Sequence, residues 1–152
     1  GQNLGAKEYD RAKKGALFGT VCGIGIAEVI GIAVFFFSPY LIAAFGGDQK
    51  AIEYGIAEAH TITLFYCLLA FSHCMAAIQR GAGRSIVPMF VMMIVWCGVR
   101  VTYISIVIRI IPVINVIYWA YPLTWFISSV IFLILFLKTD WIHGLEKQGQ
   151  GA

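Results

Sequence analysis

Four long apolar stretches run through this 152-residue chain, and each is long enough to cross a lipid bilayer as a helix. Crossing the hydrocarbon takes about 20 helical residues at ~1.5 Å each. Only 12% of the residues are charged, whereas a soluble domain carries roughly a quarter. The helices therefore lack the polar faces that a soluble protein would need. The sequence predicts an all-α polytopic membrane protein in contact with the lipid bilayer, with spans at about 15–37, 57–79, 85–108 and 113–137.

Basic residues lie mostly on one side of this four-span path. The segment 1–14, the turn at 80–84 and the tail at 138–152 hold eight Lys and Arg residues, and the opposite loops hold two. Because Lys and Arg favour the cytoplasmic side, we predict that 1–14 is a cytoplasmic loop and 138–152 a cytoplasmic, disordered tail, in the cell (inner) membrane. The chain begins without Met in what reads as an interior loop, so we expect a piece of a longer protein.

Small residues recur every four positions along the first span. Residues four apart lie on one face of a helix, and small ones let another helix approach closely in a membrane. The face is either a static packing seam or a seam along which helices slide or rock. Its members are Gly15, Gly19, Gly23, Ala27 and Gly31.

Three ionisable residues fall inside the predicted spans and are our candidates for ion coupling or a substrate path: Glu28, His73 and Arg100. Charged groups in hydrocarbon are costly and commonly mark such paths. Glu28 and Arg100 lie roughly 20 Å from the inner ends of parallel helices, so an ion pair between them is geometrically possible. His73 has a side chain that suits a proton or cation relay. Each residue could instead have a purely structural role.

Two prolines should interrupt the spans. Ser38-Pro39 is expected to end the first span, and Pro122 should kink the fourth because proline removes a helical hydrogen bond. Thr124 and neighbouring helices could satisfy the backbone groups that Pro122 frees.

Cofactor and enzyme signatures are missing from the sequence. The four cysteines lie singly in apolar stretches, without C-x-x-C pairs or a His at ligand spacing, so neither a metal site nor a disulfide framework is indicated. The glycine turns lack the G-K-[ST] ending of a phosphate-binding loop. We expect no enzyme, no metal, no cofactor and no nucleic-acid partner.

Several ordered segments resemble MATE-family multidrug and toxin exporters. The family's cytoplasmic loop in its second half is similar to Gly1-Gln2-Asn3-Leu4-Gly5-Ala6-Lys7 with residues 10–15. Its next cytoplasmic turn is similar to Arg80-Gly81-Ala82-Gly83 with Ser85 and Pro88-Met89. Its last two helices are similar to Trp96-Cys97-Gly98-Val99-Arg100 and Tyr121-Pro122-Leu123-Thr124-Trp125.

The resemblance implies that the four spans belong to the six-helix C-terminal lobe of a twelve-helix transporter, with the N-terminal lobe as partner. Such proteins exchange cationic or amphipathic compounds for Na⁺ or H⁺ by rocking one lobe against the other. Some members bind the cation through an acid in the second of these helices. Here that helix has no acid in its core, so a Na⁺ site built from it is not supported, and Glu28 is a candidate substitute.

Two other function classes are open to a chain with these features. A non-transporting membrane scaffold or assembly module could pack on partners through the small-residue face. An intramembrane enzyme is disfavoured because paired acids, His clusters and an activated nucleophile are not found.

Overall fold

The computed structural model of the chain describes residues 1–143, and every span in that part is helical. Residues 144–152, most of the predicted tail, lie outside the described residues. The elements in chain order are α1 (Gln2–Gly5), α2 (Tyr9–Ala44), α3 (Gln49–Ile62), η1 (Thr63–Phe65), α4 (Tyr66–Gly81), α5 (Ile86–Met92), η2 (Met93–Val99), α6 (Arg100–Ile110) and α7 (Asn115–Lys138).

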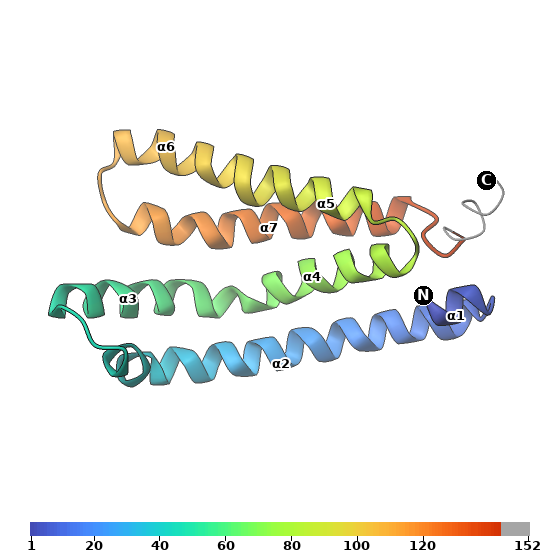
Figure 1. Cartoon of the computed structure of the whole chain (residues 1–152), viewed down its shortest axis with the longest axis horizontal. Coiled ribbons are helices and arrows are strands. Elements are labelled where there is room, and N and C mark those ends of the chain that lie inside the picture. The colour runs from blue at the N-terminus through green and yellow to red at the C-terminus, as the bar shows by residue number, and fades with distance from the viewer. Residues whose placement is uncertain (144–152) are drawn as a thin grey trace.

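These elements form four spans that are long and apolar enough to cross a membrane: Tyr9–Ala44, Gln49–Gly81, Ile86–Ile110 and Asn115–Lys138. The spans run back and forth, so the N-terminus and the segment after α7 lie at the same end of the molecule (Figure 1). α4 and α7 pack against each other in the middle, with α2 and α6 on opposite outer sides (Figure 1). The structure confirms an all-α polytopic membrane protein.

The first span does not end at Ser38-Pro39; α2 continues through both residues to Ala44. Pro39 has no N–H to give to the carbonyl of Phe35, four residues earlier. That carbonyl accepts from Ser38 Oγ at 3.1 Å and from His60 Nε2 at 3.1 Å instead. The His60 ring also stacks on the Phe35 ring at 4.3 Å. Because the freed carbonyl finds two donors, the helix passes through the proline.

The second and third spans are not uniform α-helices. In the second, the 3₁₀ turn η1 separates α3 from α4. In the third, η2 is a π-helical stretch between α5 and α6. Such stretches are rare in proteins, and those that occur often lie at functional sites. No glycine or proline accompanies the first break, since residues 56–80 contain neither.

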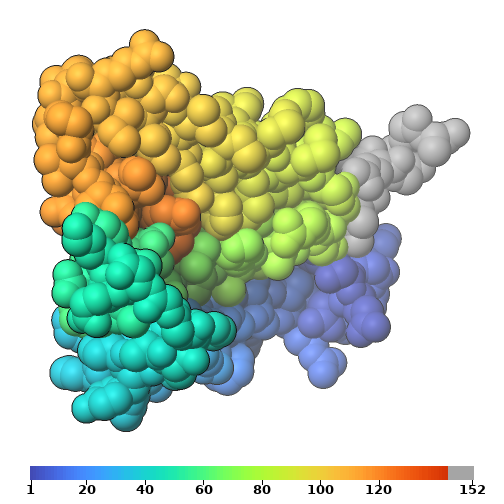
Figure 2. Space-filling model, turned by 60° about the vertical axis from the view of Figure 1, so that its left-hand side comes forward, coloured from blue at the N-terminus to red at the C-terminus, as the bar shows by residue number. Residues whose placement is uncertain are grey.

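Many large apolar side chains of the described residues are exposed on the outside of the bundle. Only 6% of the third span's apolar window is buried, against 39% for the fourth. The buried contact between α4 and α7 is built from Met75, Ala76 and Phe132. Figure 2 shows one outer face, with the yellow α6 along one flank and the blue-to-green α2 and α3 along the other. Exposed apolar flanks of this kind suit a lipid environment.

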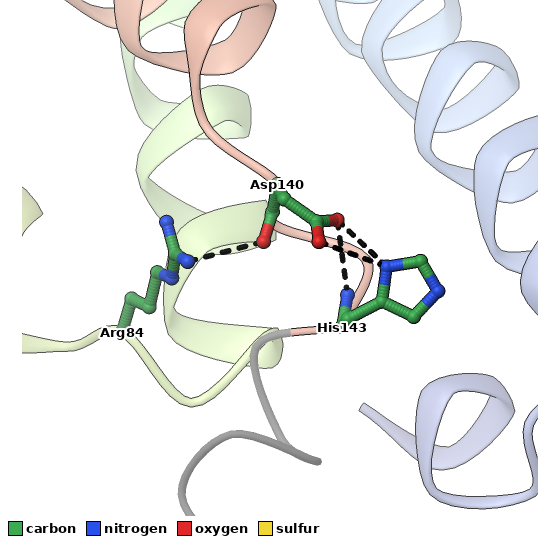
Figure 3. Close-up of polar contacts among 3 residues, drawn as sticks. All are labelled: Arg84, Asp140 and His143. Carbon is green, nitrogen blue, oxygen red and sulfur yellow. Dashed lines mark hydrogen bonds and ion pairs between the residues drawn. The ribbon is translucent and has the colours of Figure 1, made fainter.

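The end that carries the N-terminus is closed by the segment after α7. Arg84 Nη2 donates to the carbonyl of Asp140 at 3.0 Å, and the Asp140 carboxylate lies 2.8 Å from His143 Nδ1 (Figure 3). Next to this contact, Trp141 is buried in a small core with Leu4 and Ala82. These contacts tie α1, the α4–α5 turn and the chain beyond α7 together.

Candidate functional site

Glu28 sits beside the break in the second span. Its Oε2 accepts a hydrogen bond from the backbone N–H of Cys67 at 3.0 Å. At the break, the N–H of Tyr66 turns to the Thr63 carbonyl in a 3₁₀ bond. The first N–H groups of a helix lack partners within it, and that end carries partial positive charge. The carboxylate of Glu28 therefore occupies the N-terminal end of α4.

The close approach of α2 to this break depends on Gly31. Gly31 is buried, and a Cβ placed on it would lie 2.5 Å from the Thr63 carbonyl oxygen. Gly23 is also tight, with a Cβ meeting Cys74 Sγ at 3.0 Å, whereas half-buried Ala27 lies between the two. The other half of the predicted seam is open, because nothing lies within 4 Å of a Cβ at Gly15 or Gly19.

Arg100 packs against α7. Its Nε and Nη2 donate to Thr124 Oγ1 at 3.3 and 2.6 Å. The guanidinium carbon lies 4.3 Å from the centre of the Tyr121 ring and 5.8 Å from that of Trp96. Cation–π contacts of this kind are favourable for a desolvated guanidinium, so the Arg100 charge is held between α6 and α7.

A network of buried serines joins α4 to α7, and our sequence reasoning did not include it. Ser72 Oγ lies 2.9 Å from the hydroxyls of both Ser128 and Ser129. Ser128 also accepts from Trp96 Nε1 at 3.3 Å, and Ser129 donates to the Leu68 carbonyl at 3.1 Å. The adjacent serines in the middle of an apolar span were the signal available, because hydroxyls there pair across helices.

His73 is exposed on α4 and packs edge-to-face with the Trp96 ring, with ring centres 5.2 Å apart at 87°. Trp96 thus connects His73 to Arg100 and to the serine network. Within the described chain, no ion pair joins Glu28 to Arg100, since each has the partner given above. The pair cannot form because α2 and α6 lie on opposite sides of α4 and α7 (Figure 1).

Pro122 is buried inside α7. The carbonyl that it leaves without its usual helical donor is that of Tyr118. Contrary to our expectation, Thr124 does not donate to that carbonyl. Its hydroxyl is instead within hydrogen-bonding distance of the carbonyls of Ala120 and Tyr121, at 2.9 and 3.0 Å. Thr124 instead serves as the acceptor for Arg100.

Among residues 1–143, no group of three or more His, Cys, Asp or Glu side chains is placed to hold a metal ion. The site therefore consists of two parts on either side of α4. One part is a carboxylate at a helix break, and the other is an arginine, aromatic and serine cluster.

Comparison with known proteins indicates the family to which this site belongs. Searches of curated proteins and of solved structures gave no match. A comparison with protein-family models matches residues 1–106 to MatE. That range contains Glu28, the break in the second span and Arg100. The match covers more than half of the chain and confirms the resemblance drawn from its loops and turns, so the chain belongs to the MatE family of multidrug and toxin efflux transporters.

Proposed function

We propose that this chain is part of a secondary-active exporter that moves cationic or amphipathic compounds out of the cell in exchange for Na⁺ or H⁺. Its four spans contribute to the six-helix C-terminal lobe of a twelve-helix protein in the cell membrane, with an N-terminal lobe as partner. The observation that carries the proposal is the Glu28 carboxylate on the first turn of α4, inside a member of an efflux family. Discontinuous helices of this kind line ion and substrate sites in other transporter folds.

Glu28 is the residue we assign to ion coupling. An ionised carboxylate accepts a strong, charge-assisted hydrogen bond from the Cys67 N–H, and it complements the positive end of α4. Binding a proton or Na⁺ neutralises that charge and weakens its hold on α4. The packing of α2 on the second span, tight at Gly31, then depends on whether the ion is bound.

The aromatic cluster is the surface we assign to the substrate path. The Trp96 and Tyr121 rings lie around Arg100, and the Trp96 ring also contacts the exposed His73. Aromatic rings grouped in this way suit amphipathic compounds. The positive charge of Arg100 repels cations, and its bonds to Thr124 occupy it. We therefore assign Arg100 to holding α6 on α7 beside the path rather than to binding a cation.

Ethidium efflux from proteoliposomes holding the whole transporter tests the proposal, run first in a proton gradient and then in a Na⁺ gradient. We expect one of the gradients to drive efflux, and Glu28→Gln to abolish it. Glu53→Gln is the matched control, since it removes an exposed acid near the outer end of α3. Efflux that survives Glu28→Gln would end the coupling role. No efflux with either ion would overturn antiport and favour the scaffold alternative.

The orientation that we propose places both described ends in the cytoplasm. Thiol labelling in whole cells tests it, with single cysteines introduced into a transporter whose native cysteines have been replaced. Lys7→Cys should react only after permeabilisation, and Lys50→Cys should react in intact cells. The reverse pattern would invert the topology.

A further inference from the structure

A groove runs along the outside of the bundle near the end that carries the N-terminus. Its volume is about 420 Å³, within the range of roughly 300–1,000 Å³ that is usual for ligand sites. α4 forms its floor through Phe71 and Met75, while Leu17 of α2 and Leu133 of α7 belong to its walls. The groove exists because α2 and α7 both pack on α4 and leave a strip of it between them.

The two ends of this groove differ. Trp141 closes the end near the N-terminus, and it is held in place by its stack on Phe136 at 5.1 Å. The preceding residue, Asp140, is fixed by its carbonyl bond to Arg84 (Figure 3). Lys13 lies at this closed end and is the charged residue among those lining the groove. Away from it the lining is apolar, and the hydroxyl of Thr20 turns back to the Ala16 carbonyl at 2.8 Å.

We propose that this groove is a binding site for an anionic phospholipid, with one acyl chain along α4 and the phosphate at Lys13. The apolar strip and the single cation at its interfacial end match the two parts of such a lipid. The same end carries most of the chain's Lys and Arg residues, where anionic lipids of the cytoplasmic leaflet are attracted. The Lys13 charge also disfavours the cationic compounds proposed above as cargo, so the groove is separate from the substrate path.

Quenching of Trp141 by brominated lipids tests this site. The whole protein is placed in phosphatidylcholine nanodiscs that contain a small fraction of brominated phosphatidylglycerol or brominated phosphatidylcholine. The Trp141 signal is the difference between the parent protein and Trp141→Phe. We expect brominated phosphatidylglycerol to quench Trp141 more strongly than brominated phosphatidylcholine at the same fraction.

Two neighbouring lysines provide the matched variants. Lys13→Gln should reduce the preference for phosphatidylglycerol about fivefold, the factor expected for one basic residue near an anionic surface. Lys14→Gln removes the same charge from a residue outside the groove lining, and it should change the preference less than about twofold. Both lysines are exposed, so neither change disturbs the packing of the bundle.

A second pair of variants separates a bound acyl chain from attraction to the surface. Leu133→Phe narrows the groove and should lower quenching by brominated phosphatidylglycerol, whereas Ile134→Phe enlarges an exposed neighbour outside the lining and should leave it unchanged. Equal quenching by the two brominated lipids, or equal losses in the two lysine variants, would overturn the site. Absence of quenching by either lipid would show that protein covers the groove and would also overturn it.

Discussion

A methyl group added at Gly31 should push the second span away from α2. The Cβ of Gly31→Ala would lie 2.5 Å from the Thr63 carbonyl oxygen and 3.2 Å from Tyr66 Cδ2. Since contacts under 3.0 Å are essentially never seen, the backbone at Thr63 must shift, and overpacking of this kind costs about 1–3 kcal/mol. Alanine also favours a helix over glycine by roughly 0.8–1 kcal/mol, which would mask part of that cost.

Alanine variants at two other glycines of α2 control for this gain in helix propensity. Nothing lies within 4 Å of a Cβ at Gly19 or Gly25, so alanine there adds helix propensity without a clash. The free energy of unfolding of the reconstituted protein, measured by SDS titration in mixed micelles, should be about 1–3 kcal/mol lower for Gly31→Ala than for either control. The shift at Thr63 also displaces the Cys67 N–H from Glu28, so ethidium efflux should fall in this variant alone. Equal stability of the three variants would refute the close contact.

Three further changes test other contacts by the same unfolding measurement. His60→Leu removes one of the two donors to the Phe35 carbonyl and should cost about 0.5–1.5 kcal/mol; the cost should shrink in a Pro39→Ala background, and an unchanged cost there would contradict the proposed role. Thr124→Val removes the acceptor of Arg100 and should cost about 1.5–3 kcal/mol, as for hydrogen bonds to charged groups; a variant as stable as the parent would count against that contact. Ser72→Ala breaks the link to the two serines of α7 and should cost roughly 0.6 kcal/mol for each bond, the average within membranes; no loss would show that the remaining serines pair equally well without it.

The spans, their order and their back-and-forth path were predictable because they depend on length and hydropathy alone. Apolar stretches of this length have few alternatives in a bilayer, where every backbone group must be satisfied within the span. The family could also be predicted from the loops, since the turn at 80–83 and the segment at 1–7 resemble the corresponding loops of its members.

The breaks within the spans could not be predicted, because tertiary contacts create or remove them. Pro39 was expected to end a helix, but a donor 25 residues away, His60, keeps the helix intact. Conversely, the run that becomes η1 contains no helix breaker, and its turn accompanies the approach of Gly31 and the bond from Cys67 to Glu28. Such partners are distant in the sequence, so local patterns carry no trace of them.

Only part of the candidate site could be predicted from the sequence, for a similar reason. The ionisable residues Glu28, His73 and Arg100 stand out in an apolar sequence, yet their partners do not. Arg100 bonds to Thr124 rather than to Glu28, because only residues on neighbouring helices can pair. The depth of a residue along its span does not reveal which helices are neighbours.

The central place of α7 has a consequence for how the protein is made. α7 is the last span of the described chain to leave the ribosome, yet it packs against α3, α4 and the third span. Until it enters the membrane, Ser72 and Arg100 have no hydroxyl partners from Ser128, Ser129 and Thr124. The first three spans must therefore wait in the bilayer, with polar groups unpaired or hydrated, as a substrate for quality-control proteases. Chains that end before α7 should be degraded rather than accumulate as stable intermediates.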